Sequence, residues 1–431
     1  MIKRVFYGWW VVLACFLLSL YVGAVVFYGL TAFISPLKEA FGWSYTQISF
    51  AASLRGLEMG LFAPIIGFLV DRFGSRKLLL AGTMTIGLGL FSLSLTQSLV
   101  MFYASFLLLA LGAGGCTSVV TMTAVANWFE KKVGIALGIM ASGFGASGLL
   151  VPVIVEFIDR FSWRTTLIIL GLGMWALGIP LSLVVRSKPE QYGYVADGHV
   201  SGDQNYFYEV QSKGSEIGFK EALRHKSFLY LNITETIRMM TVTAVVIHVM
   251  PYLSSVGVVR TTSGLVAAAI PLVSITGRFS FGWLGDVFDK RHLLAATFGL
   301  MGTGVFAFCY AQVPWLALLF LLLFPPGFGG GMVMRGAILR EYFGTASFGK
   351  MLGIIMGAAS LGGIMGPTLA GWIFDKLADY RFAWLLLCSL TFLAVGLISK
   401  IKPLQKDESA RPTGEVNSQY IFSCKHGMTK P

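Results

Sequence analysis

Long apolar runs separated by short polar loops make up most of this chain. A membrane-spanning helix needs about 20 mostly apolar residues, and runs of this kind recur along the whole sequence. Each run therefore predicts one transmembrane helix. The twelve predicted helices lie near residues 6–33, 46–70, 77–95, 99–126, 133–157, 163–185, 227–252, 262–285, 293–311, 314–339, 349–373 and 382–400.

The two halves of the chain repeat one another. GFLVDRFGSRKLLLAG at 67–82 aligns with GWLGDVFDKRHLLAAT at 282–297, a shift of 215 residues. The same shift carries Pro152 to Pro367, so one offset explains matches in separate regions. Two related halves with a site between them are a common plan of secondary transporters. We expect an all-α membrane protein with a six-helix half at 1–186, a cytoplasmic central loop at 187–226, a second six-helix half at 227–402 and a cytoplasmic tail at 403–431.

Composition supports a membrane location. Hydrophobic residues make up 55% of the 431 residues and charged residues only 13%, whereas soluble domains carry about 25% charged residues. The net charge of +12 comes from Lys and Arg in short loops without interleaved aromatic residues, which argues against a nucleic-acid partner. These loop charges favour both termini in the cytoplasm. We expect a monomer that is integral to the plasma (inner) membrane and has the lipid bilayer as its surroundings.

The sequence carries no motif of an enzyme or of a cofactor site. It has no phosphate-binding loop, no dinucleotide-binding glycine pattern after a strand and no nucleophile elbow. Four of the five cysteines lie inside apolar runs and Cys424 lies in the tail, so neither a disulfide framework nor a metal-ligand spacing is present. We expect no catalysis, no cofactor and no metal.

The repeated loop points to a family. GFLVDRFGSRK at 67–77 resembles the loop between helices two and three of the major facilitator superfamily, whose pattern is G-x-L-x-D-R-x-G-x-R-[RK]. YGWWVV at 7–12, the pattern that begins at Arg278 (Arg-x-x-x-Gly) and KPEQYGYVADG at 188–198 resemble the monocarboxylate porter group and its oxalate–formate antiporter relatives. The resemblance covers residues 5–400 and implies transport by alternating access.

The resemblance also implies a gate. In families of this kind, the Asp and Arg of the loop hold neighbouring helices together in one state and release them in the other. A plain topology anchor is the alternative role for each of these residues. The gating residues implied here are Asp71, Arg72, Arg76, Asp286 and Arg291.

Several ionisable residues lie deep inside apolar runs, where an Arg costs about 2.5–3.5 kcal/mol and usually faces a partner or a cavity. Arg55 and Glu58 are three residues apart, as are Glu235 and Arg238, so each pair shares one helix face. Each pair is either an internal salt bridge or a proton site, in which the acid takes up a proton when its Arg turns to an anion. Arg335 lies near the end of its run, and we expect it to reach the membrane surface.

Arg278 has no acid three or four residues before or after it, so its partner comes from another helix or from a ligand. A guanidinium is suited to bidentate binding of a carboxylate. In the group that this chain resembles, an Arg on the eighth helix binds the substrate carboxylate, and we expect this role for Arg278. A bridge to Glu58 or Glu235 is the alternative. The group's nearby Asp is replaced by Ser274 and its Lys residues on helices one and eleven are missing, so one unpaired charge favours a monoanion.

Three residues are candidates for proton coupling. Glu58 lies 13 residues before Asp71, about 20 Å along a helix, which places it near mid-membrane. Glu235 is the second candidate. His248 is the third because histidine titrates near neutral pH, and its alternative role is hydrogen-bonded packing.

Together these features predict a secondary active transporter of a small organic anion, and more specifically a proton-coupled monocarboxylate symporter. An acid that is protonated together with anion binding makes the loaded carrier neutral for reorientation. Anion exchange without a proton is the alternative, and a sensor built on a transporter fold is a different class that would need a larger cytoplasmic domain. The side chains expected to bind the anion are Arg278, Tyr28, Asn232 and Tyr252.

Overall fold

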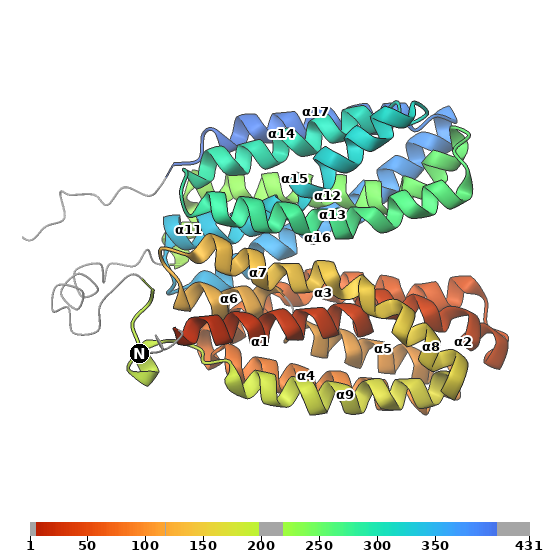
Figure 1. The fold of residues 1–431 in the computed structure, drawn as a ribbon, viewed down its shortest axis with the longest axis horizontal. Helices are drawn as coiled ribbons and strands as arrows, with labels where there is room; N and C mark the ends of the chain where they lie inside the picture. The colour runs from red at the N-terminus through yellow and green to blue at the C-terminus, as the bar shows by residue number, and fades with distance from the viewer. Residues whose placement is uncertain (1–5, 117, 198–218, 403–431) are drawn as a thin grey trace, which may run out of the picture.

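The computed structural model describes residues 6–116, 118–197 and 219–402; within these, the side chains of 31, 35, 45–46, 49–59 and 260 are outside the description. Every regular element in these ranges is helical. The helices run roughly parallel to one another in two stacked groups, the first half of the chain below and the second half above (Figure 1). This is the all-α, two-half membrane fold that the hydropathy pattern predicts.

The first half supplies six membrane spans, of which two are built from two consecutive elements each and one, at Val133–Phe161, from three. Gly23 lets the first span pass close to Ser147, because a Cβ at Gly23 would lie 2.8 Å from Cβ of Ser147. There the helix loosens into a π-helical turn. The elements are α1 (Tyr7–Val22), η1 (Gly23–Tyr28), η2 (Gly29–Phe33), α2 (Ile34–Phe41), α3 (Tyr45–Phe73), α4 (Ser75–Ser94), α5 (Leu99–Gly114), α6 (Ser118–Trp128), α7 (Val133–Ala146), η3 (Ser147–Leu150), α8 (Val151–Phe161) and α9 (Trp163–Val184).

The second half repeats the plan with unbroken helices. It follows the short helices η4 (Glu190–Tyr192) and α11 (Phe219–Arg224), and its spans start close to the predicted positions. The predicted domain boundaries near residues 186 and 226 stay predictions. The spans are α12 (Lys226–Ser255), α13 (Arg260–Gly285), α14 (Lys290–Phe308), α15 (Pro314–Phe343), α16 (Phe348–Leu377) and α17 (Arg381–Ile398).

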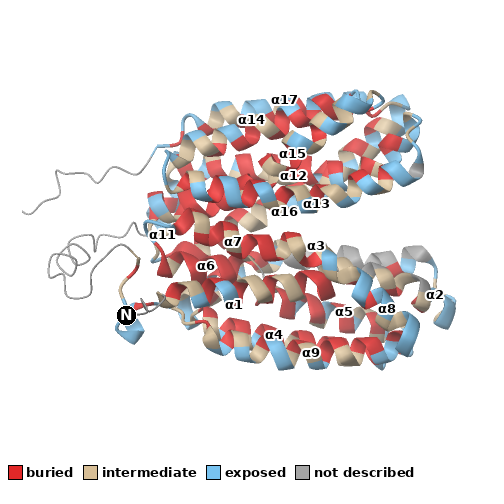
Figure 2. Cartoon of the chain, in the orientation of Figure 1, coloured by how far each residue is buried: buried red, intermediate tan, exposed pale blue. Residues whose placement is uncertain are grey.

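Length and hydropathy identify ten of these helices as membrane spans, and α3 and α14 stand where the second and ninth spans are predicted. Large apolar side chains lie on the outside of the bundle, as for Leu61, Trp283 and Leu318. Figure 2 shows exposed positions on the outer faces and buried positions where helices meet. An apolar exterior of this kind suits a lipid solvent.

Helix ends follow ordinary capping chemistry. Ser44 and Gln47 form a reciprocal capping box at the start of α3, and Asp289 accepts hydrogen bonds from two backbone amides at the start of α14. Gly74 has φ +82° at the tight turn between α3 and α4, where other residues are strained.

One end of the bundle carries the start of α1, the turn at Gly74, the end of α9 and α11; we call it the base (Figure 1). The two halves meet from the base inward along two seams, α3 against α16 and α7 against α13. Glycines make the approach possible, because a Cβ at Gly67 would overlap the backbone of Gly349 and a Cβ at Gly134 would overlap the backbone of Gly282. The halves are therefore closed on each other at the base.

Candidate functional site

Arg278 lies on the inner face of α13, at the seam with the first half. Its side chain is only 2% exposed. Nη1 donates a hydrogen bond to the carbonyl oxygen of Ala141 in α7 over 3.0 Å, whereas Nε has no partner. Within the described residues, no carboxylate lies within 4 Å of this guanidinium. A buried guanidinium with spare donors is equipped to bind an anion.

Glycines on two neighbouring helices make room for Arg278. A Cβ at Gly145 in α7 would overlap Nη1 of the guanidinium, and a Cβ at Gly329 in α15 would stand 3.1 Å from its Cγ. Tyr28, from the first half, lies near Arg278 and packs against Phe144 at a ring distance of 5.8 Å. The structure thus places Tyr28 near Arg278, and a shared role in binding an anion stays a prediction.

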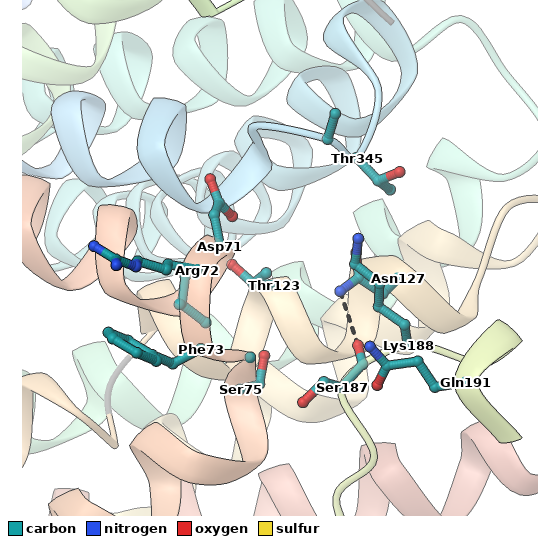
Figure 3. A pocket seen from close by; sticks show the side chains of 13 residues that line it. Asp71, Arg72, Phe73, Ser75, Thr123, Asn127, Ser187, Lys188, Gln191 and Thr345 are labelled. Carbon is teal, nitrogen blue, oxygen red and sulfur yellow. Dashed lines mark hydrogen bonds between the residues drawn. The ribbon is translucent and has the colours of Figure 1, made fainter. Parts of the chain in front are cut away.

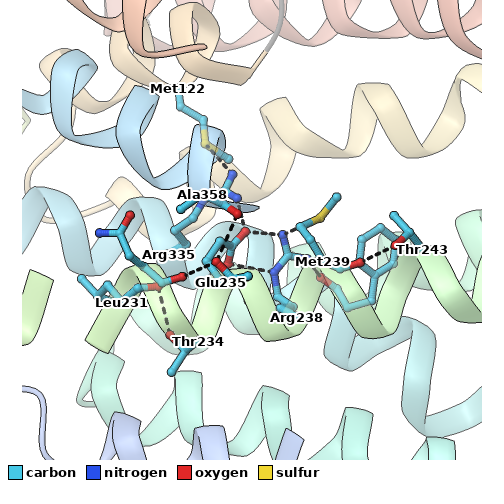
Figure 4. Close-up of polar contacts among 12 residues, drawn as sticks. Met122, Leu231, Thr234, Glu235, Arg238, Met239, Thr243, Arg335 and Ala358 are labelled. Atoms are coloured by element: carbon cyan, nitrogen blue, oxygen red, sulfur yellow. Dashed lines mark hydrogen bonds and ion pairs between the residues drawn. The ribbon is translucent and has the colours of Figure 1, made fainter. Parts of the chain in front are cut away.

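Glu235, Arg238 and Arg335 form a buried charge cluster (Figure 4). Nε of Arg238 donates to the Glu235 carboxylate over 2.9 Å, and Arg238 Nη2 and Arg335 Nη1 both donate to the other carboxylate oxygen. All three side chains are at most 3% exposed. The expectation that Arg335 reaches the surface is wrong, because Glu235 holds its guanidinium inside the protein. Arg335 also reaches the first half, where Nη2 contacts Sδ of Met122 over 3.8 Å.

Phe328 of α15 lies between this cluster and Arg278. Each of the guanidinium carbons of Arg238 and Arg278 lies 5.8 Å from the centre of its ring. The two guanidiniums also interact electrostatically. The arginines therefore belong to one charged region that is divided by an aromatic ring.

The structure does not bring the other predicted anion-binding residues to Arg278. Asn232 donates to the carbonyl oxygen of Phe228 over 2.8 Å, and its buried Oδ1 has no partner. Tyr252 is 1% exposed and packs edge-on against Phe308 and Trp384 in the core of the second half. Packing in that aromatic cluster accounts for the burial of Tyr252, so no ligand contact is needed to explain it.

The three proton-coupling candidates have different surroundings. Glu235 accepts the three guanidinium hydrogen bonds described above, which favour its ionised form. His248 contacts the hydroxyl of Tyr380 through Nδ1 over 3.1 Å and the carbonyl oxygen of Pro367 through Nε2 over 3.0 Å, a packing role. Glu58 and its neighbour Arg55 lie outside the described side chains.

Two carboxylates hold the halves together at the base. Asp71, at the end of α3, accepts hydrogen bonds from the backbone amides of Gly349 and Lys350 at the start of α16, both over 2.9 Å. Asp286, at the end of α13, accepts from the amides of Gly134 and Ile135 at the start of α7 over 2.6 and 2.9 Å. The repeat of 215 residues relates the two contacts, and helix N-termini attract negative charge. We call them the Asp71 contact and the Asp286 contact.

The two contacts differ in their neighbours. Lys350 and Lys188 interact favourably with the Asp71 carboxylate. Burial raises the pKa of Asp286, and the negative charge of Asp197 raises it further, while the two amides and Lys290 oppose the rise. Burial raises the pKa of Asp71 as well, and there the two amides and the two lysines oppose the rise. The contacts therefore differ in the repulsion of Asp286 by Asp197 and in the second lysine beside Asp71.

Among the residues that the structure describes, the three predicted gating arginines make no hydrogen bond or ion pair across the halves. Arg72 stacks on Phe73, and the backbone amide of Arg76 donates to Ser187 within the first half. Arg291 donates to the carbonyl oxygen of Ile401 over 3.4 Å within the second half. Arg340, which the sequence did not single out, does cross, donating to the carbonyl oxygen of Ala126 over 3.0 Å.

A pocket of about 170 Å³ lies at the base beside Asp71 (Figure 3). Lys188 and Gln191 line it from the first half and Thr345 from the second. Asn127 donates to the carbonyl oxygen of Ser187 there, so it holds the chain that follows α9. Within the described residues, no group of three His, Cys, Asp or Glu side chains is placed to hold a metal ion.

Within the described residues, twelve spans in two related halves, with charged side chains buried where the halves meet, are typical of a secondary membrane transporter. The chain belongs to the major facilitator superfamily, whose model matches residues 12–243 and 231–423. It is 26% identical over 421 residues to monocarboxylate transporter 12 of Xenopus laevis, covering 92% of this chain and 90% of that one. It is 25% identical over 403 residues to monocarboxylate transporter 13 of Bos taurus, covering 91% and 88%.

Solved structures share the fold at low identity. The proton:xylose symporter XylE superposes with a TM-score of 0.75 at 16% identity, covering 92% of this chain and 96% of that one. The human organic anion transporter MFSD10 gives a TM-score of 0.71 at 14% identity, covering 91% and 99%. These structures support the architecture alone.

Proposed function

We propose that this protein carries a small organic anion, most specifically a monocarboxylate, across the plasma (inner) membrane together with a proton. The observation that carries the proposal is Arg278, a buried guanidinium with unused donors and no carboxylate partner among the described residues. A carboxylate at this position supplies the missing charge and takes the free donors. The similarity to monocarboxylate transporters agrees with this substrate class.

Reorientation proceeds by opening and closing the base, which faces the cytoplasm along with both termini in this proposal. In the base-closed state, Asp71 and Asp286 cap helices of the opposite half, and Arg278 bonds to the Ala141 carbonyl across the seam. These contacts are made between halves, so they break when the halves separate at the base. A bound carboxylate competes for Arg278 and links anion binding to that separation.

Glu58 is the proton carrier in this proposal. Glu235 is held ionised by two arginines, and His248 is occupied by packing contacts with Tyr380 and Pro367. Glu58 lies near mid-membrane by its distance along α3, in the same half as Tyr28. A proton on Glu58 and an anion on Arg278 together leave the net charge of the site unchanged on loading.

The test is uptake by the full chain in proteoliposomes. Radiolabelled lactate, pyruvate, isovalerate and phenylacetate are offered with and without an inward proton gradient. We expect gradient-driven accumulation of at least one acid, its loss in Arg278→Gln, and loss of the gradient response in Glu58→Gln. Normal uptake by Arg278→Gln would refute the role of Arg278.

Anion exchange without a proton is the second candidate. Glu235 is the only buried carboxylate among the described side chains, and two arginines neutralise it. That arrangement favours exchange unless Glu58 takes up a proton. Uptake that does not depend on the proton gradient but is stimulated by the same acid inside the vesicles would identify exchange. In that case Glu58→Gln should transport normally.

A further inference from the structure

The buried charges in the described residues do not balance. Arg238, Arg278 and Arg335 face a single buried carboxylate, Glu235, which leaves two positive charges uncompensated. A monoanion on Arg278 cancels one of them. The second belongs to the charge cluster, because Glu235 shares its carboxylate between two guanidiniums. Uncompensated charge is costly inside a membrane protein, so a second anionic group is favoured there.

The geometry shows which member of the cluster faces Arg278. Arg238 and Arg278 both lie beside the Phe328 ring, and each guanidinium carbon is 5.8 Å from the ring centre. Nε and Nη2 of Arg238 are committed to Glu235, but Nη1 makes only a long 3.5 Å contact with the Phe328 carbonyl oxygen. Arg335 lies on the other side of Glu235 and points to Met122 of the first half. Spare donor capacity toward Arg278 therefore lies on Arg238.

Glycines of α15 support this arrangement. A Cβ at Gly329 would stand 3.1 Å from Cγ of Arg278, and a Cβ at Gly331 would stand 3.2 Å from Cδ of Arg238. Both arginine stems thus lie against one short stretch of helix, on either side of Phe328.

We infer that Arg238 is a second anion-binding residue and that the site, besides monocarboxylates on Arg278, also takes short dicarboxylates, with one carboxylate on Arg278 and the other on Arg238. This inference rests on the proposed role of Arg278. A monocarboxylate fills only the Arg278 side of Phe328. A dicarboxylate of the same chain length fills both sides and neutralises both surplus charges, so it binds more tightly.

The test compares matched acids on the purified full chain: butyrate against succinate, and propionate against malonate, near neutral pH. Binding is followed by the shift in unfolding temperature with ligand concentration, which does not depend on uptake. We expect succinate to act at about tenfold lower concentration than butyrate in the wild type. In Arg238→Gln the two acids should differ by no more than about twofold.

Arg335→Gln is the matched control. It removes the same charge from the same cluster, and each single variant leaves Glu235 with one arginine partner, so both are expected to fold. Arg335→Gln should keep the preference for succinate. Equal loss of the preference in both variants would show a general field effect and overturn the assignment to Arg238. A wild type that binds succinate no more tightly than butyrate would also overturn the assignment.

Arg278→Gln separates this inference from the proposed function. If Arg278 binds the common carboxylate, this variant loses the response to all four acids. One contrary result is that the four acids shift the unfolding temperature in the wild type and in Arg238→Gln alike, but not in Arg278→Gln. That result would leave the proposed function standing and refute the second subsite. Unchanged binding in Arg278→Gln would refute both.

Discussion

At the residue scale, the position of Arg278 depends on what its neighbours lack. Gly145 has no side chain at the point where Nη1 of Arg278 lies, and Gly138 has none where α13 brings the Arg278 backbone. The guanidinium reaches the Ala141 carbonyl through this gap. A glycine that faces a charged group across a seam acts here as part of the site, because any Cβ would displace that group.

Gly145→Ala should therefore impair transport through Arg278. The new Cβ overlaps Nη1 and stands 2.9 Å from Cγ1 of Ile275, so the guanidinium must move. We expect uptake at low substrate concentration to fall about tenfold or more, because displacements of about 1 Å at a reacting or binding group have large effects. Gly148→Ala is the control, since Gly148 has open space where a Cβ would be added. Equal uptake by the two variants would mean that the substrate does not use this position of Arg278.

At the element scale, each half caps a helix of the other half. The Asp71 contact closes on the start of α16 and the Asp286 contact closes on the start of α7. A carboxylate at a helix N-terminus is worth up to about 2 kcal/mol when partly buried. If the proposed gating role holds, a ligand has to supply only a few kcal/mol to release two such contacts.

The neighbours of the two contacts predict unequal effects of removing them. Asp71→Asn should open the base more than Asp286→Asn, because lysines support Asp71 whereas Asp197 repels Asp286. Labelling of a cysteine placed at Ala126, which is fully buried at the base, reports opening in a background without the five native cysteines. We expect labelling to rise several-fold in Asp71→Asn and less in Asp286→Asn, in line with about 0.5–2 kcal/mol per contact. Equal rises would refute the asymmetry, and no rise in either would refute the gating role.

The sequence predicted the elements better than their contacts. Hydropathy located the spans because it needs only local residues, and the 215-residue repeat paired the two halves because it compares one stretch of sequence with another and needs no three-dimensional contact. The sequence around Arg278 also showed that no acidic residue lies three or four positions from it. Arg335 was misplaced because its partner, Glu235, lies 100 residues away on another helix. The partners of Asp71 and Asp286 are backbone amides, which leave no side-chain pattern to read.

At the scale of the whole molecule, the two halves behave as units that touch along two seams. Both seams run inward from the base, one between α3 and α16 and the other between α7 and α13. Figure 1 shows these helices between the two groups. Transport by alternating access requires the seams to separate at the base and the opposite ends to approach, so a covalent link at the base must stop it.

Val70 and Gly349 offer a place for such a link. A Cβ at Gly349 would overlap Cγ1 of Val70, which stands where the sulfur of a cysteine at position 70 would lie, and the two residues belong to opposite halves. In the background without native cysteines, Val70→Cys with Gly349→Cys should form a disulfide under mild oxidation, because its bonding geometry needs the two Cβ atoms about 3.5–4.5 Å apart. We expect uptake in proteoliposomes to stop on oxidation and to return on reduction. Gly349→Cys alone also brings a Cβ within 2.5 Å of Oδ1 of Asp71, so uptake by this single variant is the reference for the reduced double variant. Each single cysteine variant should be insensitive to the oxidant. Continued uptake by the cross-linked protein would show that the base stays closed during transport, and the two halves would then have to move in another way.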